Sequence, residues 1–159
     1  MKKFFILSLL VLFTICAFAQ QPLYRYYNAK QKKHYFTIHF NEYGNGTPDF
    51  AYEGVSCKVF NAGDPAQGIR PMFRYYNPKT ADHFYTMVLH ELGPGDNGYT
   101  FEGPAYFLYK LQAPGSVPLL RYYNPVTTDH FYTIDKMELG PGFEGYNYEG
   151  VAGYVLRKR

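Results

Sequence analysis

Residues 74–86 read RYYNPKTADHFYT, and residues 121–133 read RYYNPVTTDHFYT. Residues 25–37 carry a diverged version of the same string, RYYNAKQKKHYFT. Extending the alignment outward from these strings gives three gapless blocks of 39 residues each, which are 22–60, 71–109 and 118–156. Twelve aligned positions hold the same residue in all three blocks. We interpret the blocks as three copies of one structural unit, since similarity at a fixed period is typical of repeat architectures.

Each block reads mostly as β-strand. In the second block, Met72–Tyr76 is aromatic and apolar and ends at an Asn-Pro turn signal, and His83–Thr86 reads as a second, shorter strand. Residues Thr86–Leu92 favour one helical turn. Residues Tyr99–Tyr109 then predict a last bent strand or a hairpin, broken at Gly103.

One block is too small to bury its own aromatic face, so we expect the three blocks to share a core. The sequence predicts an all-β fold of three repeats of about 48 residues with pseudo-threefold symmetry. A β-trefoil-like closed barrel fits this pattern and leaves few free strand edges. A three-bladed, propeller-like arrangement is the alternative.

The first nineteen residues predict a secretory signal peptide. Lys2 and Lys3 precede the apolar run Phe4–Phe18, and small residues favour cleavage after Ala19. The predicted mature chain, residues 20–159, is a suitable length for a single three-repeat domain. No later stretch is apolar enough to predict a membrane span. We therefore expect a secreted or periplasmic protein.

Charge and cysteine content narrow the function classes. Without Lys2 and Lys3, 14 Lys plus Arg face 13 Asp plus Glu, so the mature chain is nearly neutral. The short cluster at Lys30, Lys32 and Lys33 is no basic face of the kind that nucleic-acid binding requires. Cys57 is the one thiol of the predicted mature chain, so no internal disulfide can form, and we expect it to be a buried apolar group rather than a reactive thiol.

The signature Arg-Tyr-Tyr-Asn-Pro-x-Thr-x-Asp-His-Phe-Tyr-Thr, followed later by Tyr/Phe-Glu-Gly, resembles a repeat of secreted bacterial and fungal proteins. That repeat is catalogued as a domain of unknown function and often accompanies extracellular hydrolases. The resemblance implies an extracellular accessory or binding role, and it carries over no catalytic residues. The first block departs from the signature, with Ala29 for the proline and Lys33 where the other blocks have Asp82 and Asp129.

The Asp-His pair is the sharpest chemical feature of the blocks. Because side chains alternate along a strand, the histidine shares a face with an aromatic ring two residues on. A carboxylate, an imidazole and a flat ring side by side have the groups needed to hold a sugar. The predicted ligand-binding residues are Asn77, Asp82, His83 and Tyr85 in the second block and Asn124, Asp129, His130 and Tyr132 in the third. In the alternative reading, the histidine ties a loop to a strand and the aspartate closes the turn.

These patterns favour a lectin-like, non-catalytic module that binds carbohydrate or a surface glycan. An extracellular protein-interaction or structural accessory domain is the alternative. Three equal sites suit multivalent binding, and the repeated signature contains no Ser or Cys nucleophile, so we do not expect an enzyme. We predict no cofactor and no metal, although three converging histidines (His34, His83 and His130) are an alternative that would suit zinc. The sequence leaves the oligomeric state open.

Two further expectations come from the alignment. An arginine and a glutamate 28 residues apart recur in every block, as Arg25 with Glu53, Arg74 with Glu102 and Arg121 with Glu149. We predict that each pair forms a charge-assisted hydrogen bond with little solvent exposure, with stacking of the arginine on a tyrosine as a further option. Because Lys33 replaces a carboxylate, we also expect the second and third blocks to carry the binding.

Overall fold

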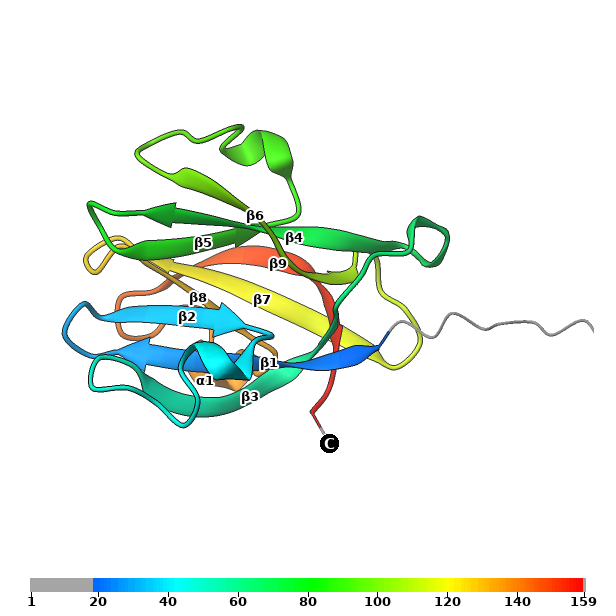
Figure 1. Cartoon of the computed structure of the whole chain (residues 1–159), viewed down its shortest axis with the longest axis horizontal. Coiled ribbons are helices and arrows are strands. Elements are labelled where there is room, and N and C mark those ends of the chain that lie inside the picture. Colours follow the sequence, from blue (N-terminus) through cyan, green and yellow to red (C-terminus); the bar gives the residue numbers. More distant parts are fainter. Residues whose placement is uncertain (1–18, 159) are drawn as a thin grey trace, which may run out of the picture.

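The structure, a computed structural model, describes residues 19–158, so most of the predicted signal peptide, residues 1–18, lies outside the described residues. Within residues 19–158 the chain forms nine antiparallel strands and very little helix, which confirms the all-β class (Figure 1). The first strand of each block begins two residues before the aligned segment. The first block has β1 (Gln20–Asn28), β2 (Lys33–Thr37) and β3 (Ala51–Phe60); the second has β4 (Ile69–Asn77), β5 (Asp82–Thr86) and β6 (Thr100–Tyr109); the third has β7 (Ser116–Asn124), β8 (Asp129–Thr133) and β9 (Asn147–Leu156).

Short helical turns complete the blocks. Each follows the second strand of its block, at Phe40–Glu42, Leu89–Glu91 and, as α1, Lys136–Leu139. The turn Leu89–Glu91 falls inside the segment that the sequence predicted to be helical. A further turn, Pro65–Gln67, lies in the linker between the first and second blocks. Asp64 caps it by accepting a hydrogen bond from the backbone of Ala66.

Every block has the same strand order and the same register. The long first strand lies in the middle, the short second strand pairs along one edge, and the last strand pairs along the other. The same cross-strand pair therefore recurs in each block: Tyr27 lies opposite His34, Tyr76 opposite His83 and Tyr123 opposite His130. The last strand of the second block is continuous rather than a hairpin. Gly103 sits in it at φ 101, where the register with β4 shifts.

The blocks meet at both ends of the molecule. Three single-residue bridges join the last strands to one another, from Phe60 to Phe107, from Tyr109 to Tyr154 and from Lys58 to Leu156. At the other end, the short strands β2, β5 and β8 lie against each other in pairs. In Figure 1 the first block (blue to cyan) lies below the second (green), and the third (yellow to red) is seen behind them.

One hydrophobic core includes residues of all three blocks, which confirms the shared core. At its centre the rings of Phe36, Tyr85 and Tyr132 occupy aligned positions and are fully buried. Their centroids lie 5.5–5.9 Å apart in edge-to-face pairs. Cys57 is also fully buried, and burial raises the pKa of its thiol to about 12. The β-trefoil-like arrangement of the three blocks stays a prediction.

Candidate functional site

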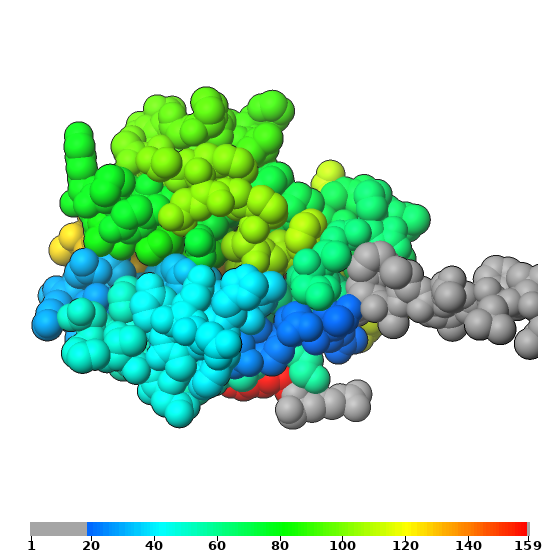
Figure 2. Space-filling view, viewed as in Figure 1, coloured from blue at the N-terminus to red at the C-terminus, as the bar shows by residue number. Residues whose placement is uncertain are grey.

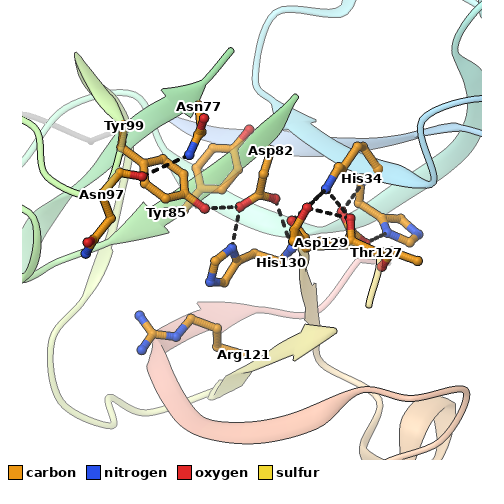
Figure 3. Close-up of polar contacts among 12 residues, drawn as sticks. His34, Asn77, Asp82, Tyr85, Asn97, Tyr99, Arg121, Thr127, Asp129 and His130 are labelled. Carbon is orange, nitrogen blue, oxygen red and sulfur yellow. Dashed lines mark hydrogen bonds and ion pairs between the residues drawn. The ribbon is translucent and has the colours of Figure 1, made fainter. Parts of the chain in front are cut away.

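A buried carboxylate joins the second block to the third. Asp82, at the start of β5, accepts the backbone N–H of His130 at 3.0 Å, and its Oδ2 lies 2.6 Å from Nδ1 of the same histidine. The Tyr99 hydroxyl donates to the same oxygen. Burial acts to raise the pKa of Asp82, but the hydrogen bonds from His130 and Tyr99 outweigh it and hold the pKa below its usual value. We call such a set of Asp, His and Tyr an interface triad (Figure 3).

A second interface triad joins the third block to the first. Asp129 accepts the backbone N–H of His34 at 2.8 Å and lies 2.6 Å from its Nδ1, and the Tyr146 hydroxyl donates at 2.5 Å. Both aspartates are fully buried. A carboxylate partner places the ring proton on Nδ1 and leaves Nε2 directed elsewhere. In both triads Nε2 lies 3.8–3.9 Å from a glutamate oxygen, Glu53 for His34 and Glu149 for His130.

The interface between the first and second blocks differs. Lys33 takes the place of the aspartate, and Phe50 takes the place of the tyrosine. The Lys33 ammonium is buried and turns toward the third block, where it donates to the carbonyl of Thr127 and to the carbonyl and hydroxyl of Thr128 at 2.6 and 2.7 Å. Burial lowers the pKa of Lys33. Within residues 19–158, His83, the matching histidine, therefore bonds no carboxylate.

The predicted Arg–Glu pairs form in every block, which confirms that the arginine and the glutamate 28 residues apart are in contact. The Nε atoms of the arginines lie 2.7–2.9 Å from the glutamate 28 residues on, in the pairs Arg25–Glu53, Arg74–Glu102 and Arg121–Glu149. Their side chains are 18–31% exposed, so the pairs are half-buried rather than buried.

Each arginine also reaches the neighbouring block, which the sequence did not predict. Arg25 pairs with Glu138 and Arg121 with Glu91, both at 2.9 Å. Arg74 instead donates to the Tyr35 hydroxyl, which donates in turn to Glu42. The guanidinium groups lie over rings of the neighbouring blocks, Phe131 for Arg25, Tyr35 for Arg74 and Phe84 for Arg121. The stacking partner is thus a tyrosine once and a phenylalanine twice.

Two clefts open over these interfaces. The cleft between the first and third blocks measures about 510 Å³, and six of its lining residues are Arg25, Tyr27, His34 and Glu53 from the first block and Asn124 and Phe143 from the third. The cleft between the first and second blocks measures about 460 Å³, and its lining includes Tyr76, His83 and Glu102 from the second block and Asn28, Tyr43 and Phe50 from the first. Tyr, His and Glu occupy aligned positions in the two clefts. Each cleft therefore has one wall built from the same three residue types.

Most of the predicted ligand-binding residues line neither cleft. Asp82, Tyr85, Asp129 and Tyr132 are fully buried. The hydroxyl of Tyr85 donates to the backbone carbonyl of Phe36 at 2.8 Å, and that of Tyr132 donates to Tyr85 at 2.7 Å. His130 is 8% exposed in its triad. The direct ligand role of these residues stays a prediction, and the structure gives each of them an internal partner.

Two of the other three predicted residues line the clefts. Asn77 and Asn124 are 5% exposed and donate to the carbonyls of Asn97 and Glu144. Asn124 and His83 line the two clefts. Sequence reasoning missed Tyr27 as a cleft residue, although its position is one of the twelve identical in all blocks.

Residues 19–158 contain neither a cluster suited to a metal ion nor a helix suited to a membrane span. Between residues 19 and 158, no three His, Cys, Asp or Glu side chains lie close enough together to hold a metal ion. His34 and His130 lie instead in separate triads, and His83 packs on Tyr35. In the same part of the chain, no helix has the length and apolar character needed to cross a membrane.

The fold and its interfaces define an all-β protein of three like blocks joined by buried carboxylate–histidine contacts. The chain belongs to the family described as Domain of unknown function (DUF5648), whose model matches residues 22–156. Comparison with curated proteins and with solved structures found no match.

Proposed function

We propose that the protein is a secreted or periplasmic, non-catalytic module that binds carbohydrate in the clefts between its blocks. One observation carries the proposal: the same Tyr, His and Glu wall lines two clefts, with an asparagine from the neighbouring block opposite. A sugar offers apolar C–H faces and hydroxyl groups that both donate and accept, which suit flat rings beside a few polar side chains. Both clefts fall within the usual volume range of small-molecule sites.

We further propose that the three blocks are related by a pseudo-threefold axis, in a trefoil-like arrangement. The common register within blocks and the three bridges between β3, β6 and β9 support it. The propeller-like alternative is less well supported, because propeller blades are four-stranded sheets around a channel. Here the blocks are three-stranded, and Phe36, Tyr85 and Tyr132 fill the centre. A crystal structure in which the blocks superpose poorly would exclude the axis.

A glycan array probed with the predicted mature protein, residues 20–159, tests the function. The sugar that binds best is then titrated calorimetrically into wild-type protein and into Tyr27→Ala and Tyr76→Ala, one for each cleft. Tyr148→Ala is the matched control, because Tyr148 is an exposed aromatic residue that lines neither cleft. We expect a loss of affinity in at least one cleft variant and none in the control. An array without binding, or affinity unchanged in both cleft variants, would refute the proposal.

A second candidate function is protein binding by the outer face of the second block. Val88, Leu89 and Phe101 are 57%, 41% and 37% exposed. In the first block the residues aligned with Leu89 and Phe101 are in ring contact at 5.7 Å, which indicates that these side chains are neighbours. Exposed apolar clusters mark interaction surfaces. Glycan binding that survives Phe101→Ser, with loss of a protein partner in the same variant, would separate the two functions.

A further inference from the structure

The first block differs from the other two where it faces the second block. Lys33, Asp49 and Phe50 all line the cleft between these blocks. The aligned residues of the other blocks are aspartate, glycine and tyrosine, and two of these three, the aspartate and the tyrosine, form the interface triads. The changes therefore fall together, on one interface. Figure 2 shows the first block (blue to cyan) and the second (green) meeting along a seam on the visible face.

The first consequence concerns His83. Its ring lies against Tyr76 and Tyr35, with centroids 4.6 and 4.7 Å away. In the part of the chain that the structure describes, the ring makes no hydrogen bond, whereas His34 and His130 each bond an aspartate. Burial, together with the nearby Arg74, lowers the pKa of His83 to about 4, against the weaker opposing effect of Asp82 and Asp129. The imidazole is thus neutral at neutral pH, with one donor and one acceptor unused.

The second consequence concerns Asn28. Its Oδ1 accepts the backbone N–H of Gln31, as the matching asparagines accept from their own turns. The amide nitrogens of Asn77 and Asn124 donate to the carbonyls of Asn97 and Glu144 at 3.1 and 3.0 Å. Among residues 19–158, the amide nitrogen of Asn28 has no such acceptor.

Proline explains why that bond is missing. Asn97 and Glu144 adopt positive φ, 52 and 53, and a glycine at φ 85 follows each of them. The first block has Pro48 and Asp49 at these positions, and the proline ring holds φ near −65°. The left-handed turn cannot form, so the loop closes differently, with Thr47 donating to the carbonyl of Phe50 at 2.8 Å. The backbone carbonyl of Pro48 therefore does not take the position in which the carbonyls of Asn97 and Glu144 accept from their asparagines.

We propose that the cleft between the first and second blocks is the specialised sugar site of this chain, and that it takes an uncharged sugar. The inference rests on the proposed carbohydrate function. One sugar hydroxyl donates to the free nitrogen of His83, another accepts from the amide of Asn28, and the rings of Tyr76, Tyr43 and Phe50 form the walls. In the other blocks, the matching polar atoms are used to hold the protein together.

The charges around this cleft favour a neutral ligand. Lys30 pairs with Asp49 at 2.9 Å, and Glu102 pairs with Arg74 at 2.7 Å. The Lys33 ammonium is held by Thr127 and Thr128. No lining charge is left to attract an anionic or cationic sugar, since each has a partner among the described residues.

Calorimetry with the neutral sugar that binds best on the array tests the inference. His83→Phe keeps a ring and removes both nitrogens, and Asn28→Asp keeps the acceptor for Gln31 and removes the amide donor. We expect each variant to lose affinity at least about tenfold, because a lost hydrogen bond of about 1.4 kcal/mol corresponds to a tenfold change. Tyr148→Ala is the control, with unchanged affinity. Because the His83 ring has no internal hydrogen bond, we expect His83→Phe to fold; circular dichroism confirms it, and Asn28→Asp gives an independent result.

The outcomes separate this inference from the proposed function. If His83→Phe and Asn28→Asp bind the sugar as the wild type does, while Tyr27→Ala loses affinity, the site is the other cleft and the inference is wrong, although the function stands. A preference for charged sugars would also overturn it. If no sugar binds the wild-type protein, the proposed function itself fails.

Discussion

Oδ2 of Asp129 lies 2.6 Å from Nδ1 of His34, although the two residues are 95 positions apart in the chain. Oδ1 of the same carboxylate accepts the backbone N–H of His34 at 2.8 Å. One side chain therefore both orients the imidazole and satisfies an N–H at the edge of β2, where an unpaired donor would be costly. Asp82 makes the same two contacts with His130, so two of the three block interfaces contain the same aspartate–histidine arrangement.

Loss of Asp129 should destabilise the fold strongly. Asp129→Ala leaves the His34 ring, its N–H and the Tyr146 hydroxyl without a partner, and we expect a cost on the order of 3–5 kcal/mol in the free energy of unfolding. Urea denaturation measures it. Asp135→Ala is the matched control, because that aspartate is exposed and only caps α1, a role worth about 1 kcal/mol. Equal costs for the two variants would contradict a structural role of the triad.

Two buried tyrosines should respond oppositely to loss of the hydroxyl. The Tyr85 hydroxyl donates to the carbonyl of Phe36 at 2.8 Å and accepts its N–H at 3.1 Å, so Tyr85→Phe should cost about 1–3 kcal/mol. The Tyr106 hydroxyl is buried without a partner among the described residues. Tyr106→Phe should therefore leave stability unchanged or raise it. Chemical denaturation of both variants decides, and a larger loss for Tyr106→Phe would disprove the core as described.

The half-buried ion pairs should contribute less than the triads. Glu102→Ala breaks the contact with Arg74, and we expect a lower melting temperature that corresponds to about 1 kcal/mol, since both side chains keep contact with solvent. Glu91→Ala should cost more, because Glu91 accepts from both Arg121 and Thr86 and links two blocks. Calorimetric melting curves compare the two variants. The reverse order would argue against the link between the blocks.

The protein should become less stable as the pH falls, partly because the pKa of His83 is lower in the folded protein than in the unfolded chain. Its pKa is about 4 in the folded protein, against an ordinary value of 6.5. Between these values the unfolded chain binds more protons, so the free energy of unfolding decreases as the pH falls from 6.5 to 4 and loses no more from this group below that. His83→Phe should lose less stability than the wild type over this range. Protonation of Asp82 also lowers the stability, but at lower pH and equally in the wild type and in His83→Phe. Parallel curves between pH 7 and 4.5 would contradict the low pKa.

The repeat alignment predicted what lies within a block, and much less of what lies between blocks. The Arg74–Glu102 contact followed from a constant spacing in three aligned copies. The Asp82–His130 contact did not, because each aspartate has its own histidine as the next residue. Strand alternation turns these neighbours to opposite faces, so the partner must come from another block, which the alignment alone does not place. One signal was present in the sequence: the block that has Lys33 for the aspartate also has Phe50 for the tyrosine that would donate to it.

The most direct test of the proposed sugar site is a crystal structure of the mature protein with the neutral sugar that binds best on the array. We predict a sugar ring in the cleft between the first and second blocks, against the Tyr76 side, with a hydroxyl within hydrogen-bond distance of a His83 nitrogen and another near the amide nitrogen of Asn28. A sugar bound between the first and third blocks, or on the outer face at Phe101, with the His83 ring untouched, would contradict it.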